Sequence, residues 1–304
     1  MQKVAILMST YNGQKYVQEQ IDSLLSQKDV GVEIIIRDDG SKDDTVALLE
    51  SIASKTKCIT VLKEENVGVT KSFNLLAAYA KDNSSADYYA FCDQDDVWES
   101  DKLIVALRAL KGYPETQPNM YFSNLRMVDE NLKTIREMYY PGEVKIGSRK
   151  ALVQVFTYGC TCVFNRRALE MFCSVNEQHL CHDHWIFELC TYYGNAVYDE
   201  NSHILYRQHG DNLCGAKQRG FALWKIRLHT LFVEGLGHNF DLSAQQILSL
   251  EGDMRPEDKE YVYRIAHYRE NLKYKFGLLF SRIYSIGKLS KDIIIKFRIL
   301  INRL

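Results

Sequence analysis

The sequence predicts an α/β fold with a mostly parallel, doubly wound sheet and a helical C-terminal extension. Up to Leu125, short apolar runs rich in Val and Ile alternate with longer segments whose apolar residues recur at helical spacing. This alternation is typical of parallel sheets, in which each helix returns the chain to the start of the next strand. From Pro256 onward the helical spacing continues without a strand-like run, which predicts the extension.

The alternating part reads as strands joined by amphipathic helices. In the first helix, Val17, Ile21 and Leu24 share one face, as expected for a helix that packs on a sheet. The strands are expected at Val4–Met8, Val32–Arg37, Ile59–Lys63, Tyr88–Cys92 and Met120–Leu125. The helices are expected at Gln14–Gln27, Thr45–Ser54, Val69–Ala80 and Ser100–Lys111.

Beyond Val128 this alternation ends, and the chain divides into three parts. Residues 1–128 and 129–215 are expected to be two halves of one domain, followed by the extension at 216–304. In the second half, Asp129–Ser148 reads as a long polar loop. After it we expect a strand at Tyr158–Phe164, a helix at His182–Tyr193, and strands at Ala196–Tyr198 and Ile204–Arg207. Gly277 and Gly287 are expected to divide the C-terminal helix.

The composition is that of a globular protein, with 46% hydrophobic and 25% charged residues and a formal net charge of -1. We expect no nucleic-acid partner. The eight cysteines are scattered through predicted elements and are expected to be free, with Cys160 and Cys162 facing the same way on their strand. There is no signal-peptide layout and no apolar run approaching about 18 residues, so we expect a cytoplasmic protein.

Carboxylates follow the most apolar strand of the chain. Tyr88–Cys92 leads directly into Asp93, Asp95 and Asp96. A buried strand cannot carry unpaired carboxylates into the core, so they are expected at its C-terminal end, where open α/β sheets bind their ligands. Three carboxylates this close repel one another unless a cation or a proton lies between them. Oxygen ligands of this kind suit Mg²⁺ or Mn²⁺ shared with a phosphate.

Three further motifs follow other strands of the same sheet. Ser9-Thr10-Tyr11-Asn12-Gly13 opens the first helix, at a turn where phosphates or a nucleoside commonly bind. Asp38 and Asp39 end the second strand, and Asn66–Lys71 precedes the third helix, offering backbone N–H groups and a cation. Each motif alone is compatible with simple helix capping. Together with the acids after the fourth strand they predict one ligand site.

These motifs resemble those of family 2 inverting glycosyltransferases, which have the GT-A fold and use a nucleotide-sugar donor. Ser-Thr-Tyr-Asn-Gly, Arg-Asp-Asp-Gly-Ser and Phe-Cys-Asp-Gln-Asp-Asp-Val-Trp are close to those of bacterial rhamnosyltransferases of surface polysaccharide synthesis. The resemblance covers roughly residues 1 to 215. It implies that residues 1–128 bind the nucleotide sugar and that residues 129–215 supply the acceptor site and the catalytic base.

The resemblance also implies roles for single residues of the donor site. Asp39 would hydrogen-bond N3 of the pyrimidine, with Asp38 beside it. Asp93 would approach the ribose or the donor sugar, and Asp95 would bind a Mn²⁺ or Mg²⁺ ion that bridges the two phosphates. The other donor-site residues implied are Ser9, Thr10 and Tyr11 beside the base and Lys71 near the pyrophosphate.

Two more roles come from the second half. Asp183, in His-Asp-His-Trp, matches the family's general base, although an N-cap role is an alternative that the residue type alone leaves open. His209 matches a late histidine that would be a second metal ligand. The crowded group of His179, Cys181, His182 and His184 lacks the two separated ligand pairs of a structural zinc site, so no zinc is expected there.

The C-terminal extension combines an apolar stripe with basic charge. From Asn271 to Leu304 there are eight Lys or Arg residues against one acid, Asp292. The stripe comprises Leu279, Ile283, Ile286, Leu289, Ile293, Phe297, Leu300 and Leu304. Such a stripe commonly packs against the rest of the protein, but with this charge it also fits a helix on a membrane surface. Both alternatives stay open, and the second predicts peripheral contact with the inner face of the cell membrane.

The motifs thus predict a metal-dependent glycosyltransferase that moves L-rhamnose from dTDP-rhamnose to a lipid-linked glycan. A UDP-hexose donor (galactose, glucose or N-acetylglucosamine) is the alternative within the same fold. A haloacid-dehalogenase-like phosphatase is a rival, because Asp93-Gln94-Asp95-Asp96-Val97 resembles its nucleophile motif and Gly252-Asp253 resembles its late acidic motif. However, Gly252 follows a helical segment and not a strand, and this rival leaves Ser9–Gly13 unexplained. A silent nucleotide-sugar sensor is the third interpretation.

Overall fold

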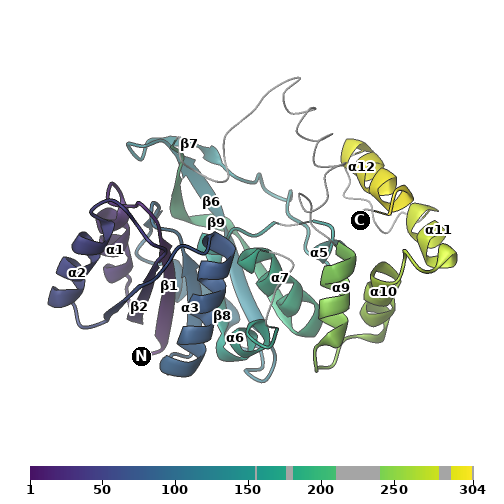
Figure 1. Ribbon diagram of the computed structural model, residues 1–304, viewed down its shortest axis with the longest axis horizontal. Helices are drawn as coiled ribbons and strands as arrows, with labels where there is room; N and C mark the ends of the chain where they lie inside the picture. The colour runs from purple at the N-terminus through teal and green to yellow at the C-terminus, as the bar shows by residue number, and fades with distance from the viewer. Residues whose placement is uncertain (155, 176–180, 210–239, 281–288, 303–304) are drawn as a thin grey trace.

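The computed structural model describes residues 1–154, 156–175, 181–209, 240–280 and 289–302, arranged around one nine-stranded sheet (Figure 1). The strand order is β3-β2-β1-β4-β8-β6-β9-β5, and β7 pairs with β6. Neighbours from β3 to β4 are parallel, as are β6 and β9, whereas β8 is antiparallel to both of its neighbours. The strands are β1 (Lys3–Thr10), β2 (Gly31–Asp38), β3 (Ile59–Lys63), β4 (Tyr88–Cys92), β5 (Val97–Trp98), β6 (Asn119–Val128), β7 (Thr134–Glu137), β8 (Cys162–Asn165) and β9 (Asn195–Arg207).

Helices cover both faces of this sheet, as the alternating sequence predicts. In β1, Ile6 faces a core shared with α1 and α4, whereas Leu7 faces a second core shared with α3, α7 and α9. This two-sided burial confirms the doubly wound α/β fold. The helices are α1 (Val17–Leu25), α2 (Thr45–Lys55), α3 (Val69–Asn83), α4 (Lys102–Leu110), α5 (Ser148–Ala151), α6 (Arg166–Phe172), α7 (His182–Tyr193), α9 (Phe240–Ser249), α10 (Pro256–Ala266), α11 (Leu272–Phe280) and α12 (Leu289–Leu300).

The polar stretch predicted as a long loop contains strand β7, so that prediction was wrong in part. β6 and β7 form a hairpin whose turn is closed by Asp129, since its Oδ1 accepts the backbone N–H groups of Asn131 and Lys133, each at 2.9 Å. Leu132 takes a positive φ of 62° in this turn. The strand was missed because it is short and mostly polar, with no apolar run to mark it.

The strand predicted at Tyr158–Phe164 begins instead as a 3-10 turn over Gly159–Thr161, and β8 starts only at Cys162. Cys160 therefore lies in the core on the α1 side of the sheet and Cys162 in the core on the α3 side, so the expectation that both face the same way was wrong. Similarly, the two short strands predicted after Asn195 are one continuous strand, β9, with a register shift opposite Asn124.

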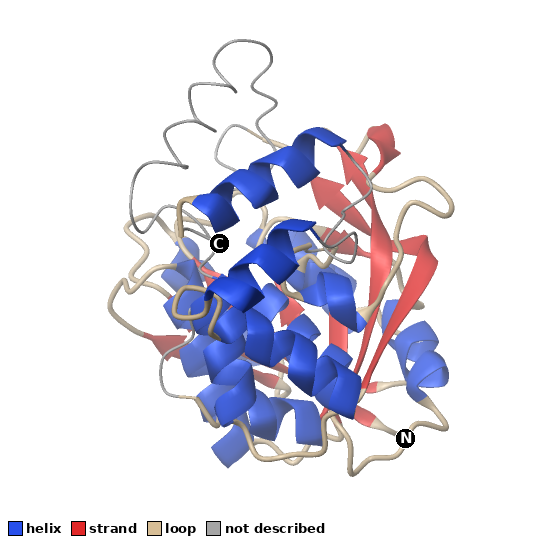
Figure 2. Ribbon diagram, turned by 90° about the vertical axis from the view of Figure 1, so that its right-hand side faces the viewer, coloured by secondary structure: helices blue, strands red, loops and turns tan. Residues whose placement is uncertain are grey.

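The C-terminal helices pack beside α7 and lie together at one end of the molecule (Figures 1 and 2). Helix α10 begins at Pro256, as the sequence predicts. Gly277 lies inside α11 and does not break it, which corrects the sequence-based prediction, whereas Gly287 lies outside the described residues. Among the described residues, no helix combines the length and apolar character needed to span a bilayer.

Candidate functional site

The two acids at the end of β2 accept hydrogen bonds from protein groups on all of their carboxylate oxygens. Asp38 accepts hydrogen bonds from the hydroxyl of Thr10 at 2.9 Å and from the backbone N–H and hydroxyl of Ser41 at 2.8 and 2.6 Å. Asp39 accepts the backbone N–H groups of Val67 and Gly68, each at 2.9 Å. Both side chains are buried. These two carboxylates therefore join the turns after β1, β2 and β3 into one rigid edge.

Asp39 also lies at the N-terminus of α3, where a carboxylate is favoured by the helix dipole. It forms a buried ion pair with Arg37, whose guanidinium also donates to the hydroxyl of Ser72 at 3.1 Å. The Ser72 hydroxyl lies 2.6 Å from that of Ser9. Lys71, in the first turn of α3, is exposed next to this group. Of the residues predicted to line the donor site, Ser9 and Asp39 are thus linked through Ser72 and Arg37, and Lys71 directly precedes Ser72 in α3.

The turn after β1 is held against the loop after β4 by Gln94, which the sequence-based reasoning did not single out. Its side-chain oxygen accepts the backbone N–H of Tyr11 at 2.9 Å, and its amide nitrogen donates to the Tyr11 carbonyl at 3.0 Å. A Cβ atom at Gly13 would lie 2.1 Å from the Gln94 oxygen, so a larger residue there would displace the Gln94 amide. Tyr11 itself stays 43% exposed. The only sequence signal for Gln94 was its position between acids.

The acids after β4 meet residues from distant parts of the chain. Nε2 of His209 lies 2.7 Å from Oδ2 of Asp95, across 114 residues of sequence. The two predicted metal ligands are therefore adjacent. Burial, together with the negative charges of Asp95 and Asp183, raises the pKa of Asp93 to about 7. Asp93 thus lies within electrostatic reach of both the predicted metal ligand and the predicted base.

Three buried residues, Asp96, Cys160 and Lys102, lie close to these acids. Oδ1 of Asp96 accepts the backbone N–H of Arg207 at 3.1 Å. The other oxygen of Asp96 is buried without a hydrogen-bond partner among the described residues. Ligand atoms of Asp93, Asp96 and Cys160 lie within 4.8 Å of one another. Lys102 is fully buried nearby, with its ammonium 3.4 Å from the centre of the Trp98 ring, and burial lowers its pKa to about 8.

Arg207 is a second residue that the sequence-based reasoning did not assign. Its Nε donates to the backbone carbonyl of Asp95 at 2.8 Å, and another guanidinium nitrogen donates to the carbonyl of Glu130 at 2.6 Å. The guanidinium lies over the ring of Tyr16, 4.6 Å from its centre, and forms an ion pair with Glu19. Arg207 therefore fixes the backbone of Asp95 at the end of β9. In the sequence, the sign of this role was that Arg207 lies two residues before His209.

Asp183 lies in the first turn of α7, where its Oδ1 accepts the N–H of His184 at 2.8 Å. Its histidine neighbours are buried. The ring of His182 stacks on Phe73 at 3.9 Å between centres, and Nε2 of His184 lies 3.2 Å from the carbonyl of Ala151. Because both rings belong to the core, Asp183 is the group of this motif left partly exposed, while His179 lies outside the described residues.

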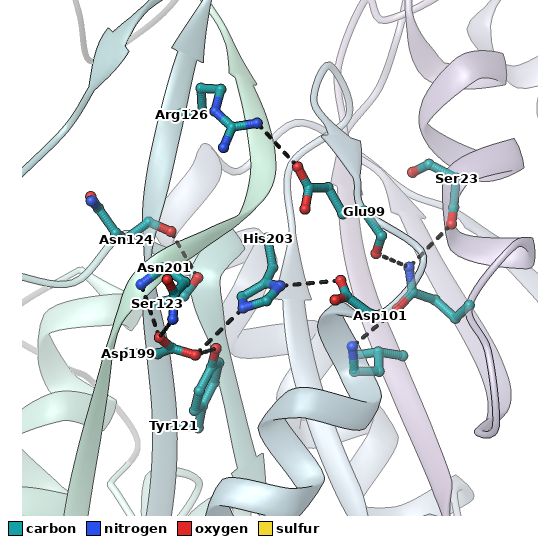
Figure 3. Close-up of polar contacts among 12 residues, drawn as sticks. Ser23, Glu99, Asp101, Tyr121, Ser123, Asn124, Arg126, Asp199, Asn201 and His203 are labelled. Carbon is teal, nitrogen blue, oxygen red and sulfur yellow. Dashed lines mark hydrogen bonds and ion pairs between the residues drawn. The ribbon is translucent and has the colours of Figure 1, made fainter.

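A second polar cluster joins β9 to the start of α4 (Figure 3). Nδ1 of His203 lies 3.1 Å from a carboxylate oxygen of Asp101, and its Nε2 lies 3.4 Å from Asp199. Glu99, whose N–H donates to the His203 carbonyl at 3.0 Å, is itself paired with Arg126. Ligand atoms of Glu99, Asp101 and His203 lie within 4.8 Å of one another, but these residues belong to none of the motifs that predict the donor site, so we assign no metal here. The cluster instead fixes the strand that leads to the site.

The residues at the end of β4 fit a divalent cation. The carboxylate of Asp95 and the imidazole of His209 lie within hydrogen-bonding distance of each other, at 2.7 Å, and both are ligand types that bind Mn²⁺, with imidazole suiting a transition metal better than Mg²⁺. Burial and the neighbouring carboxylates raise the pKa of Asp93, and one oxygen of Asp96 has no hydrogen-bond partner among the described residues, so this group of acids favours compensation by added positive charge. A cation would supply that compensation.

Comparison with known proteins agrees with this geometry. Residues 5–172 match the profile of glycosyl transferase family 2. The chain belongs to this family. It is 32% identical over 228 residues, 69% of this chain and 74% of the relative, to the dTDP-rhamnosyl transferase RfbG of Shigella flexneri. The protein is therefore a glycosyltransferase, and the phosphatase interpretation has no comparable support.

Solved structures show the same fold at low sequence identity. TarS of S. aureus, residues 1–349 in complex with UDP-GlcNAc, superposes with a TM-score of 0.61 at 13% identity, over 100% of this chain and 88% of that 1–349 chain. A mannosyltransferase of Pyrobaculum calidifontis, in complex with GDP-Man and Mn²⁺, gives a TM-score of 0.51 at 15% identity, over 99% of this chain and 88% of that chain. Both matches confirm the GT-A architecture.

Proposed function

We propose that the protein is a metal-dependent, inverting glycosyltransferase that transfers L-rhamnose from dTDP-rhamnose to a lipid-linked polysaccharide acceptor. The observation that carries this proposal is the convergence of Asp95, His209, Asp93 and Asp183 at one edge of the sheet. The rhamnosyl donor is supported by the 32% identical relative. Residues 1–128 would bind the donor, residues 129–215 would bind the acceptor and supply the catalytic base, and residues 216–304 would form the extension.

In the donor site, Asp95 and His209 would hold the metal, which would neutralise charge on the diphosphate leaving group. Asp39 would accept the N3–H of the pyrimidine through Oδ2, which accepts the Gly68 N–H and, among the described residues, no other hydrogen bond. Ser9 and Tyr11 would flank the base, with Thr10 and Asp38 bracing the turn behind them. The exposed cation of Lys71 would approach the pyrophosphate.

For the chemical step, Asp183 would act as the general base. Its carboxylate would take the proton from an acceptor hydroxyl while that oxygen attacks the anomeric carbon. The bond from this carbon to the diphosphate oxygen breaks at the same time, so the configuration inverts and no covalent intermediate forms. The proximity of Asp183 to Asp93 supports this role, because it brings the base close to where the donor sugar would bind.

A donor screen tests the proposal directly. The protein is incubated with Mn²⁺ and, in turn, dTDP-rhamnose, UDP-galactose, UDP-glucose and UDP-N-acetylglucosamine, and binding is followed by calorimetry and release of the nucleoside diphosphate by chromatography. We expect dTDP-rhamnose to bind tightest and to be turned over slowly even without acceptor. Preference for a UDP-hexose would replace the donor assignment. Binding without any turnover, with or without lipid-linked acceptor, would favour the sensor interpretation.

A further inference from the structure

Helices α11 and α12 lie at the end of the molecule formed by the extension (Figure 2). Both expose large apolar side chains. On α11 they recur every four residues and on α12 at intervals of four and three, so each set lies on one face of its helix. Two of them, Phe276 and Phe280, stack with ring centres 6.3 Å apart. This outer face consists of Leu272, Phe276 and Phe280, which are 68%, 52% and 81% exposed, and Ile293, Phe297 and Leu300, which are 59%, 40% and 56% exposed.

The opposite sides of the same helices are already packed. Leu278 of α11 and Ile295 and Ile299 of α12 are buried in the core that also contains α7 and α9. The two helices are also tied to each other, because Nζ of Lys275 donates to the Leu300 carbonyl at 2.8 Å. The packing alternative predicted from the sequence thus accounts for one side of each helix. It leaves the outer face without a role in folding.

The charges around the outer face indicate what it contacts. Lys273 and Lys296 are exposed among its apolar residues. In sequence, α11 and α12 together carry five Lys or Arg residues and a single acid, Asp292. An apolar patch of this kind on a monomer marks an interaction site, and basic residues beside it attract anionic lipid headgroups. A symmetric contact with a second copy would bring this basic face against the same basic face of its partner, so it is disfavoured.

We propose that this outer face docks on an anionic lipid surface. Phe276, Phe280 and Phe297 would enter the boundary between headgroups and acyl chains, while Lys273 and Lys296 contact the headgroups. Strand β8 is antiparallel to both β4 and β6, so the acids after β4 lie at the edge of the sheet toward which β6 also runs. Helix α12 lies above α10 and α11 in Figure 1, on the side of the molecule toward which β6 runs. Docking would therefore bring the site near a lipid-linked acceptor. That last consequence rests on the proposed function, whereas lipid binding itself does not.

The test is co-sedimentation of the full chain with vesicles of phosphatidylcholine, with and without phosphatidylglycerol. We expect binding to the anionic vesicles at low salt and release as salt is raised, because the attraction is screened. The double variant Phe276→Ser/Phe280→Ser should reduce binding by about tenfold or more, since it removes most of the apolar insertion on α11. Lys273→Glu/Lys296→Glu should reduce binding to anionic vesicles specifically.

The matched control is Leu75→Ser/Ile135→Ser, which changes two apolar residues that are 42% and 53% exposed on other elements. It should bind vesicles as wild type does. All variants should retain the wild-type rate of donor hydrolysis in solution, so a failure of the glycosyltransferase proposal would be read separately from a failure of docking. Equal sedimentation of wild type and the double Phe variant would overturn the proposal. So would a stable dimer of the wild type that the Phe variant loses, or equal binding to neutral vesicles.

Discussion

The acids that follow β2 and the acids that follow β4 occupy the same edge of the sheet but have different surroundings. Every carboxylate oxygen of Asp38 and Asp39 accepts a hydrogen bond from the protein. In contrast, Asp93, Asp95 and Asp96 face one another, a thiol and His209. The first group is therefore completed by folding. The second is held in place by Arg207 but needs a ligand to balance its charge.

The largest effect, on nucleotide binding, should come from changing the acids that follow β4. Asp95→Asn removes a predicted metal ligand, so it should weaken Mn²⁺-dependent nucleotide binding by more than the roughly hundredfold typical of losing a partner outside the ligand shell. In the metal-free protein the same variant should keep or raise the melting temperature, because a repulsive charge is lost. Calorimetry and thermal melts measure both. Asp82→Asn, on the exposed end of α3, is the control; wild-type nucleotide binding by Asp95→Asn would contradict the metal assignment.

Next in size is the effect on catalysis. Asp183→Asn keeps the oxygen that accepts the His184 N–H but loses basicity. We expect turnover to fall by roughly 10² to 10⁴, the range for loss of a general base, while nucleotide affinity stays unchanged. Initial rates of transfer and calorimetry on the same preparation make the comparison. An unchanged rate would mean that Asp183 is only a residue of the first turn of α7.

Changing the acids that follow β2 should lower the stability of the protein. Asp39→Ala leaves the guanidinium of Arg37 buried without its carboxylate, and it frees two backbone N–H groups. Breaking a buried pair on one side costs about 3–5 kcal/mol, so the free energy of unfolding should fall by that order. Nucleoside binding should weaken with or without metal. Denaturant titration measures the first, and Lys71→Ala, which changes an exposed residue nearby, should leave stability unchanged. A stable Asp39→Ala protein would remove the contrast between the two groups.

The smallest expected effect concerns Lys102, which is buried close to Asp96. Because burial lowers its pKa from 10.5 to about 8, the unfolded chain binds a proton between these pH values that the folded chain does not. The free energy of unfolding therefore gains a contribution that rises with pH across this window. Lys102→Met lacks that contribution. Its stability relative to wild type should be greatest below about pH 8 and should decline toward pH 10.5; a pH-independent difference would place a neutral or well-paired amine in the core.

Local sequence patterns predicted most of the sheet because side-chain periodicity and helix length are properties of short segments. The strands β1 to β4 appear at or next to their predicted bounds. Strand β5 was not expected because it is only two residues long, and helix α6 because it is short and begins with two arginines. Chain position alone also placed acids at the ends of β2 and β4. It did not distinguish them, because their partners, Val67, Gly68 and His209, come from other elements.

By itself, then, the sequence determined the α/β class, the edge of the sheet that carries the site and the glycosyltransferase motifs. Only the tertiary structure decided which of the acids have hydrogen-bond partners. It likewise decided that Asp95 contacts His209 across 114 residues, and that Arg207 and Gln94 hydrogen-bond to the backbone of the site. It also decided which apolar residues of the extension are buried and which form the outer face. The physical reason is that periodicity records the neighbours of a residue along its own helix or strand. Burial and hydrogen bonding at a site depend on neighbours that folding brings from elsewhere in the chain.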